Sequence, residues 1–128
     1  MHYASLRHAR RFRNVTRAGR YPPRTLAALF LITSSRKLWK NWCKAVDSKG
    51  IEWAASHGAD PGWDAYHLEQ AALSLACHDH PQVTLYDLTD RGNYPTELIV
   101  LVLSALLLAR GERTPKFNEK RRINHVSA

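Results

Sequence analysis

The densest group of potential metal ligands in the sequence is the run Cys77, His78, Asp79 and His80. Thiolates and imidazoles are preferred zinc donors, but a zinc site usually takes a second pair of ligands from another part of the chain. The sequence has neither a C-x-x-C nor an H-x-x-x-H pair to supply them. We therefore interpret this run as the polar end of a helix, where histidines are well placed against the helix dipole, and predict neither a metal nor another cofactor.

A second group, His8 with Arg11 and the aspartates Asp79, Asp87 and Asp90, has the residue types of a phosphodiester-cleaving site. Such chemistry needs carboxylates that hold a metal, or a base that a third group orients. The spacing does not bring these residues together, and we expect His8 at the edge of a first helix beside Phe12. The sequence also lacks a glycine-rich phosphate loop and a nucleophile elbow. We predict no catalytic residues and a protein that is not an enzyme.

Aromatic side chains next to cations are a third chemical possibility, because bases stack on them. Trp39 and Trp42 share an apolar stripe at helical spacing, so we expect them in the core. Trp63 follows the Pro61-Gly62 turn and is freer to be exposed, while Trp53 fits either environment.

Charge is unevenly distributed along the 128 residues, which carry a net charge of +8. Residues 1–46 contain 11 basic and no acidic residues, residues 47–109 contain 2 and 9, and residues 110–128 contain 6 and 2. The stretch from Arg7 to Arg24 alone holds seven arginines. Arginine suits planar, bidentate contact with phosphate, and cations gain affinity for nucleic acid by releasing its counterions.

The basic front leaves three hypotheses open. In the first, it binds nucleic acid or a nucleoprotein complex. In the second, it pairs internally with the acidic middle of the chain and binds nothing. In the third, the protein is a regulator or inhibitor of another protein, for example of a host defence system, with charge setting its partner. The candidate nucleic-acid-binding residues of the first hypothesis are Arg7, Arg10, Arg11, Arg17, Lys37, Lys40 and Lys44.

The elements that position these residues are predicted to be helices. Ser5 can cap a first helix that ends at Gly19, and Pro22 and Pro23 suit the first turn of a short apolar second helix. Further helical segments follow at 36–46, around 65–77 and around 95–110, and Thr84 with Asp87 resembles a capping box for a short turn. Only VTLYDL is ambiguous between helix and strand.

The predicted fold is all-α, with about five helices wrapped around a buried apolar C-terminal helix at about 95–110. Its run from Leu98 to Ala109 has almost no polar residue around its circumference, so we expect neighbours to cover it on all sides. We expect a single helical domain at 1–111 and a flexible basic tail at 112–128.

Several features bear on location. The run 98–109 would be about 18 Å long, too short for a hydrocarbon layer of about 30 Å, so no membrane span is expected. Cys43 and Cys77 lie in apolar patterns, which suits reduced, buried thiols more than a disulfide. An arginine-rich start also occurs in mitochondrial presequences, but this one fits an integral helix. The oligomeric state stays open.

The opening S-x-x-H-x-x-R-F, formed by Ser5, His8, Arg11 and Phe12, is followed by LAALFLITSSRKLWKN, GIEW, LSLAC and LYDLTDRGNYPTELIVLVLSALLLARG. In this order the segments resemble a family of small, all-helical, functionally uncharacterised proteins of bacterial phages, prophages and mobile elements. The resemblance implies a mobile-element setting in the cytoplasm of a bacterial host and supplies no activity. Members usually carry acids around the opening histidine, where this chain has Arg7 and Arg10.

Overall fold

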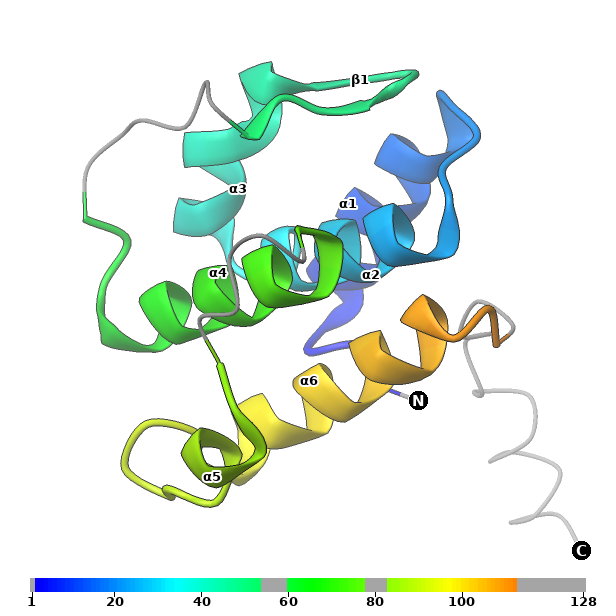
Figure 1. The fold of residues 1–128 in the computed structure, drawn as a ribbon. Coiled ribbons are helices and arrows are strands. Elements are labelled where there is room, and N and C mark those ends of the chain that lie inside the picture. The colour runs from blue at the N-terminus through cyan, green and yellow to red at the C-terminus, as the bar shows by residue number, and fades with distance from the viewer. Residues whose placement is uncertain (1, 54–59, 78–82, 113–128) are drawn as a thin grey trace, which may run out of the picture.

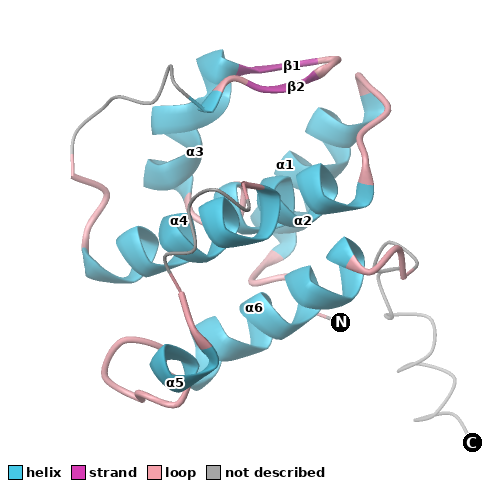
Figure 2. Cartoon of the chain, viewed as in Figure 1, coloured by secondary structure: helices cyan, strands magenta, loops and turns pink. Residues whose placement is uncertain are grey.

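A computed structural model describes residues 2–53, 60–77 and 83–112 of the chain (Figure 1). The described part is mostly helical, as Figure 2 shows, and the all-α prediction is confirmed. The elements are α1 (Leu6–Arg17), α2 (Pro23–Ile32), α3 (Arg36–Trp42), a 3-10 turn η1 (Cys43–Ala45), β1 (Val46–Asp47), β2 (Gly50–Ile51), α4 (Trp63–Ala76), α5 (Leu85–Leu88) and α6 (Thr96–Ala109).

The centre of the fold is α2. It packs against α4 and α6 over most of its length and also contacts α1 and α3 (Figure 1). Every residue from Ala27 to Thr33 is buried. As the sequence predicts, Pro22 and Pro23 stand at the start of this helix, where a proline costs no hydrogen bond. A short helix that is apolar on every side is stable because neighbours surround it.

The prediction that the C-terminal helix is the buried centre is wrong. In α6 the residues that face the core are Leu98, Leu101, Val102, Ala105 and Leu108. The side chain of Leu103, at the middle of the helix, is 51 % exposed, and Leu106 and Leu107 are also exposed. Because α6 is apolar all round, its sequence does not indicate which face meets the core. The position of α2 decides that.

Helix α1 begins as predicted at Ser5, whose hydroxyl accepts from the backbone N–H of His8 at 3.1 Å. Ala9 and Phe12 turn toward α2 and are buried. Leu6, in the first turn of the same helix, is exposed.

The segment after α3 forms a two-stranded antiparallel pair in which Val46 faces Ile51. No strand was predicted there, because two residues a strand are too few to produce an alternating pattern. The pair closes onto the end of α1: the hydroxyl of Tyr21 donates to the carbonyl of Asp47 at 2.6 Å. A Cβ on Gly19 would lie 2.5 Å from the carbonyl oxygen of Ser48, so only glycine fits this approach.

The ambiguous VTLYDL segment contains the short helix α5. Thr84 and Asp87 form the predicted capping box, in which each side chain accepts from the other residue's backbone N–H. Two further expectations concern the membrane and the tail. Among the described residues no helix is both long and apolar enough to cross a membrane. The predicted basic tail, from residue 113 onward, lies outside the described residues.

Candidate polyanion-binding face

Six of the seven predicted nucleic-acid-binding residues are exposed to solvent. Three come from α1 and three from α3 and the 3-10 turn that continues it. Their cationic groups are therefore available to a ligand at the surface. The six residues are Arg7, Arg10, Arg17, Lys37, Lys40 and Lys44.

Arg11 is the exception, because its side chain is partly buried and already bonded within the protein. Its Nε donates to the backbone carbonyl of Thr33 at 2.8 Å, where α2 ends. The last carbonyls of a helix lack partners within the helix, so Arg11 satisfies one of them and fixes α1 against α2. The pKa of Arg11 is lowered by burial first, and then by the positive charges of Arg7 and Arg36.

The lowered pKa of Arg11 identifies Arg7 and Arg36 as like charges that act on this side chain, after burial as the first cause. Arg7 and Arg11 lie one turn apart on α1, and Arg36 is the first residue of α3. Arg36 is exposed and belongs with the candidate residues, although the sequence analysis did not select it. Arg36 directly follows Ser35, which caps α3. No pattern in the sequence predicts that its charge acts on Arg11 of α1. The exposed cations Arg7, Arg10, Arg17, Arg36, Lys37, Lys40 and Lys44 are called the basic face below.

The acidic middle of the chain does not neutralise this face within the described residues. Four of its carboxylates are held by nearby backbone N–H groups: Asp47 accepts from Lys49 and Gly50, Asp60 from Gly62, Asp87 from Thr84, and Asp90 from Gly92. Glu69 instead accepts from the indole Nε1 of Trp42 at 2.7 Å. No basic-face residue forms an ion pair with an acid in residues 2–53, 60–77 or 83–112.

His8 lies in the core and not at the edge of α1, where it was predicted. Its Nδ1 accepts from the backbone N–H of Ala4 at 2.8 Å, so the ring proton is on Nε2, which donates to the carbonyl of Phe30 at 2.7 Å. Burial lowers the pKa of His8 to about 4, the bond to Phe30 opposes this shift, and the charge of Arg11 adds to it. Because both ring nitrogens are bonded inside the core, this neutral imidazole is not available to exchange a proton with a substrate.

The other chemical groups foreseen from the sequence do not converge where the structure describes them. Asp87 caps α5 and Asp90 holds the turn before α6. Cys77 ends α4, while His78, Asp79 and His80 lie outside the described residues. No group of three or more histidine, cysteine or acidic side chains is arranged for a metal in the described ranges. Cys43 and Cys77 are partly buried, less than predicted, and neither forms a disulfide.

The tryptophans divide as the sequence predicts. Trp42 is buried, Trp39 is partly buried, and Trp53 packs edge-on against Trp42 with ring centres 5.0 Å apart. Trp63 is 63 % exposed, and its indole donates to the carbonyl of Gly92 at 3.3 Å. An open hollow of about 370 Å³ beside it is lined mainly by the start of α4, with Ser35 on its other side. Asp64 at this hollow disfavours a phosphate there.

Comparison with models of known protein families, with curated proteins and with solved structures found no match.

Proposed function

We propose that this protein is a non-enzymatic accessory protein that binds nucleic acid or a nucleoprotein complex through the basic face. The observation that carries the proposal is that the seven basic-face residues form no ion pair with an acid among the described residues. Phosphates of a nucleic acid would supply the missing anions, and release of their condensed counterions would drive binding.

The cluster of Arg7, Arg11 and Arg36 supports the proposal energetically. Like charges held close together raise the free energy of the unbound state, and the lowered pKa of Arg11 reflects that repulsion together with burial. A bound phosphate removes the repulsion that these side chains suffer in its absence. Arg7 and Arg36 are exposed and can contact phosphate, while Arg11 stays bonded to Thr33 and contributes through its field.

Recognition of this kind does not depend on base sequence. Phosphate contacts position a protein on a nucleic acid without distinguishing its bases. The exposed ring of Trp63 shares its hollow with Asp64, whose negative charge opposes a nucleic-acid strand there, so we assign this ring no role in stacking bases. We expect binding to both duplex and single strands, with a strong dependence on salt.

A second candidate function is a regulator or inhibitor that binds another protein. It is favoured by apolar side chains at the surface, since large exposed apolar patches mark interaction sites. The most exposed are Leu85 and Tyr86 on α5, each 83 % exposed, and Leu103 on α6 is 51 % exposed. For the setting, we propose a phage or mobile element in the cytoplasm of a bacterial host, on the strength of the family resemblance alone.

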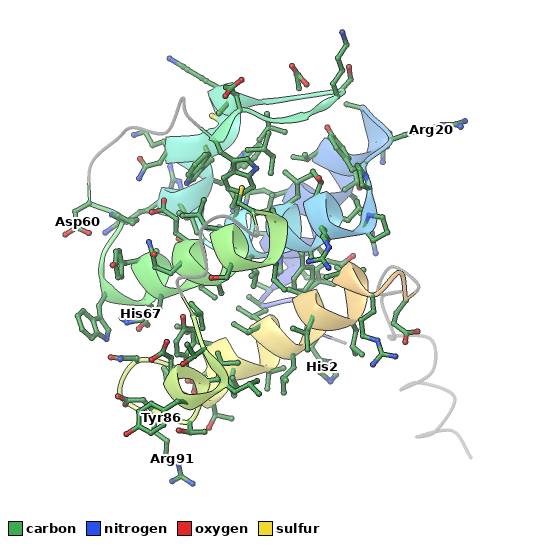
Figure 3. All side chains as sticks on the ribbon, in the orientation of Figure 1. His2, Arg20, Asp60, His67, Tyr86 and Arg91 are labelled. Atoms are coloured by element: carbon green, nitrogen blue, oxygen red, sulfur yellow. The ribbon has the colours of Figure 1, made fainter. Side chains whose placement is uncertain are left out.

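The test is the salt dependence of nucleic-acid affinity, measured by fluorescence anisotropy at nanomolar protein. We compare the parent with two double variants that remove the same charge: Arg7→Gln with Arg10→Gln on α1, and Arg91→Gln with Arg110→Gln elsewhere. Arg91 projects from the loop after α5, at the opposite end of the view from α3 (Figure 3). Each phosphate contact adds about 0.7 to 0.9 to the log–log slope.

The first double variant should therefore flatten the slope by about 1.4 to 1.8, and the second should leave it nearly unchanged. Equal effects of the two variants would mean that affinity follows net charge and not the basic face. No binding by the parent at about 50 mM salt would overturn the proposal and favour a protein partner.

A further inference from the structure

The outward side of α6 carries a continuous apolar stripe, formed by Ile99, Val100, Leu103, Leu106 and Leu107, which is called the α6 stripe below. Leu103, Leu106 and Leu107 are exposed, and the first two residues are partly buried. Their spacing of i, i+1, i+4, i+7 and i+8 places them on one helix face. The core-facing residues of the same helix lie on the opposite face.

No charged residue interrupts this stripe. The nearest charges along α6 are Glu97 in its first turn and Arg110 directly after its end. A helix packed on only one side normally carries polar residues on the other, because exposed apolar area is unfavourable in water. Ile99 packs partly against the core, but Leu103, Leu106 and Leu107 remain 51 %, 43 % and 38 % exposed. A second packing surface would remove this apolar area from water.

We propose that the α6 stripe is the interface of a two-fold symmetric homodimer, in which α6 packs antiparallel against α6 of a second copy. The stripe is self-complementary under a two-fold axis through Leu103. In that arrangement Leu103 meets its own equivalent, Ile99 lies opposite Leu107, and Val100 lies opposite Leu106. Such isologous contacts are the commonest way in which one protein pairs with itself.

The end charges favour the antiparallel arrangement over the parallel one. Arg110 of one copy would lie level with Glu97 of the partner subunit, so opposite charges flank the stripe at both ends. In the intramolecular state Arg110 has only a long, exposed contact of 3.9 Å with Glu112. A parallel pair would place glutamate beside glutamate and arginine beside arginine, at an electrostatic cost.

The size of the surface predicts a weak dimer. A 14-residue helix is about 21 Å long, and a pair of them buries less than the roughly 800 Å² per partner of a standard interface. The exposed Leu85 and Tyr86 of α5 can extend it, because only the short loop after Leu88 separates α5 from the first turn of α6 (Figure 1). We expect dissociation in the micromolar range.

The first experiment is sedimentation equilibrium of the full chain from about 1 to 200 µM, a range chosen around the affinity of weak interfaces. The parent should pass from monomer to dimer. Leu103→Gln changes the centre of the interface in both copies, because the two-fold axis passes through this residue. It should weaken the dimer at least about tenfold. Leu6→Gln changes a leucine of similar exposure on α1 and should have no effect. Leu106→Gln serves as the second variant if Leu103→Gln melts early.

The second experiment tests the orientation. Glu97→Arg and Arg110→Glu should each weaken self-association, whereas an equimolar mixture of the two variants should form heterodimers of near-parental affinity. A parent that stays monomeric throughout, a dimer insensitive to Leu103→Gln, or no recovery in the mixture would each overturn the proposal. This inference does not rest on the proposed function, which is tested at nanomolar protein.

Discussion

The imidazole of His8 joins the start of the chain to the central helix, because it donates to the carbonyl of Phe30 at 2.7 Å while it accepts from the backbone N–H of Ala4. Its ring lies 4.6 Å from that of Phe30 and 5.2 Å from that of Tyr3. The carbonyl of Phe30 also receives a longer contact, of 3.3 Å, from the hydroxyl of Thr33. The residues of the S-x-x-H-x-x-R-F opening therefore share one structural task, the attachment of α1 to α2: Ser5 caps α1, His8 and Phe12 enter the core, and Arg11 bonds the end of α2.

Acid should destabilise the protein through His8. The folded-state pKa of about 4 lies below the unfolded value of 6.5, so the unfolded state takes up the proton first as the pH falls. Stability from this group is complete above about pH 6.5, falls between pH 6.5 and 4, and is lost below. The shift corresponds to about 3 kcal/mol. Urea denaturation at pH 7.5, 6 and 5 measures it.

The control for this pH dependence is the variant His8→Gln, which should be less stable at pH 7.5 but flatter between pH 7.5 and 5. His2→Gln, at an exposed histidine, should follow the parent. If His8→Gln shows the same pH profile as the parent, His8 is not the group that titrates.

Substitution of Arg11 should lower the stability of the protein more than substitution of its neighbour Arg10. Arg11→Gln removes the hydrogen bond to Thr33 and should lower the free energy of unfolding by about 1 to 2 kcal/mol. Arg10→Gln, at an exposed position, should change it by no more than about 0.5 kcal/mol. Chemical denaturation of the two variants, at equal net charge, compares them. Equal losses would show that the bond to Thr33 contributes nothing.

The two apolar helices should respond oppositely to truncation. Leu29→Ala in α2 removes a side chain with no exposed area and should cost about 2 to 5 kcal/mol. Leu103→Ala in α6 should cost less than about 1 kcal/mol at low micromolar protein, because half of its side chain is already in water. Thermal and urea unfolding midpoints of the two variants measure these losses of stability. A large loss for Leu103→Ala would restore the expectation that α6 is the buried centre.

Gly19→Ala should loosen the contact between the end of α1 and the β1–β2 turn. The added Cβ would lie 2.5 Å from the oxygen and 2.8 Å from the Cα of Ser48, and backbone atoms cannot move aside without shifting the turn. We expect a loss of about 1 to 3 kcal/mol. Thermal unfolding of Gly19→Ala measures this loss, with Gly92→Ala as the control. Gly92→Ala should cost less, because the atom nearest to the added Cβ is a side-chain oxygen of Asp90 at 3.2 Å.

Helix starts and stops could be predicted from the sequence because they depend on neighbours within about one turn. Ser5 caps α1 and Thr84 with Asp87 caps α5, each through hydrogen bonds that span three residues. Pro22 and Pro23 open α2 without such a bond, because the fixed backbone angle of proline suits the first turn of a helix. The exposure of most basic-face residues was predictable for the same reason, since helical periodicity separates them from the apolar stripe on their own helix.

Only the tertiary structure decided which apolar helix is central. The runs 27–32 and 98–109 are both apolar all round, so periodicity cannot rank them, and the difference arises because α4 and α6 both pack on α2. The role of Arg11 likewise depends on where α2 ends, 22 residues along the chain from it. The sequence placed a basic and an acidic segment in one chain, but the short-range backbone bonds of the aspartates determined that the described acids leave the basic face without ion pairs. Long-range contacts of this kind depend on distances between elements, and a one-dimensional pattern carries no information on those distances.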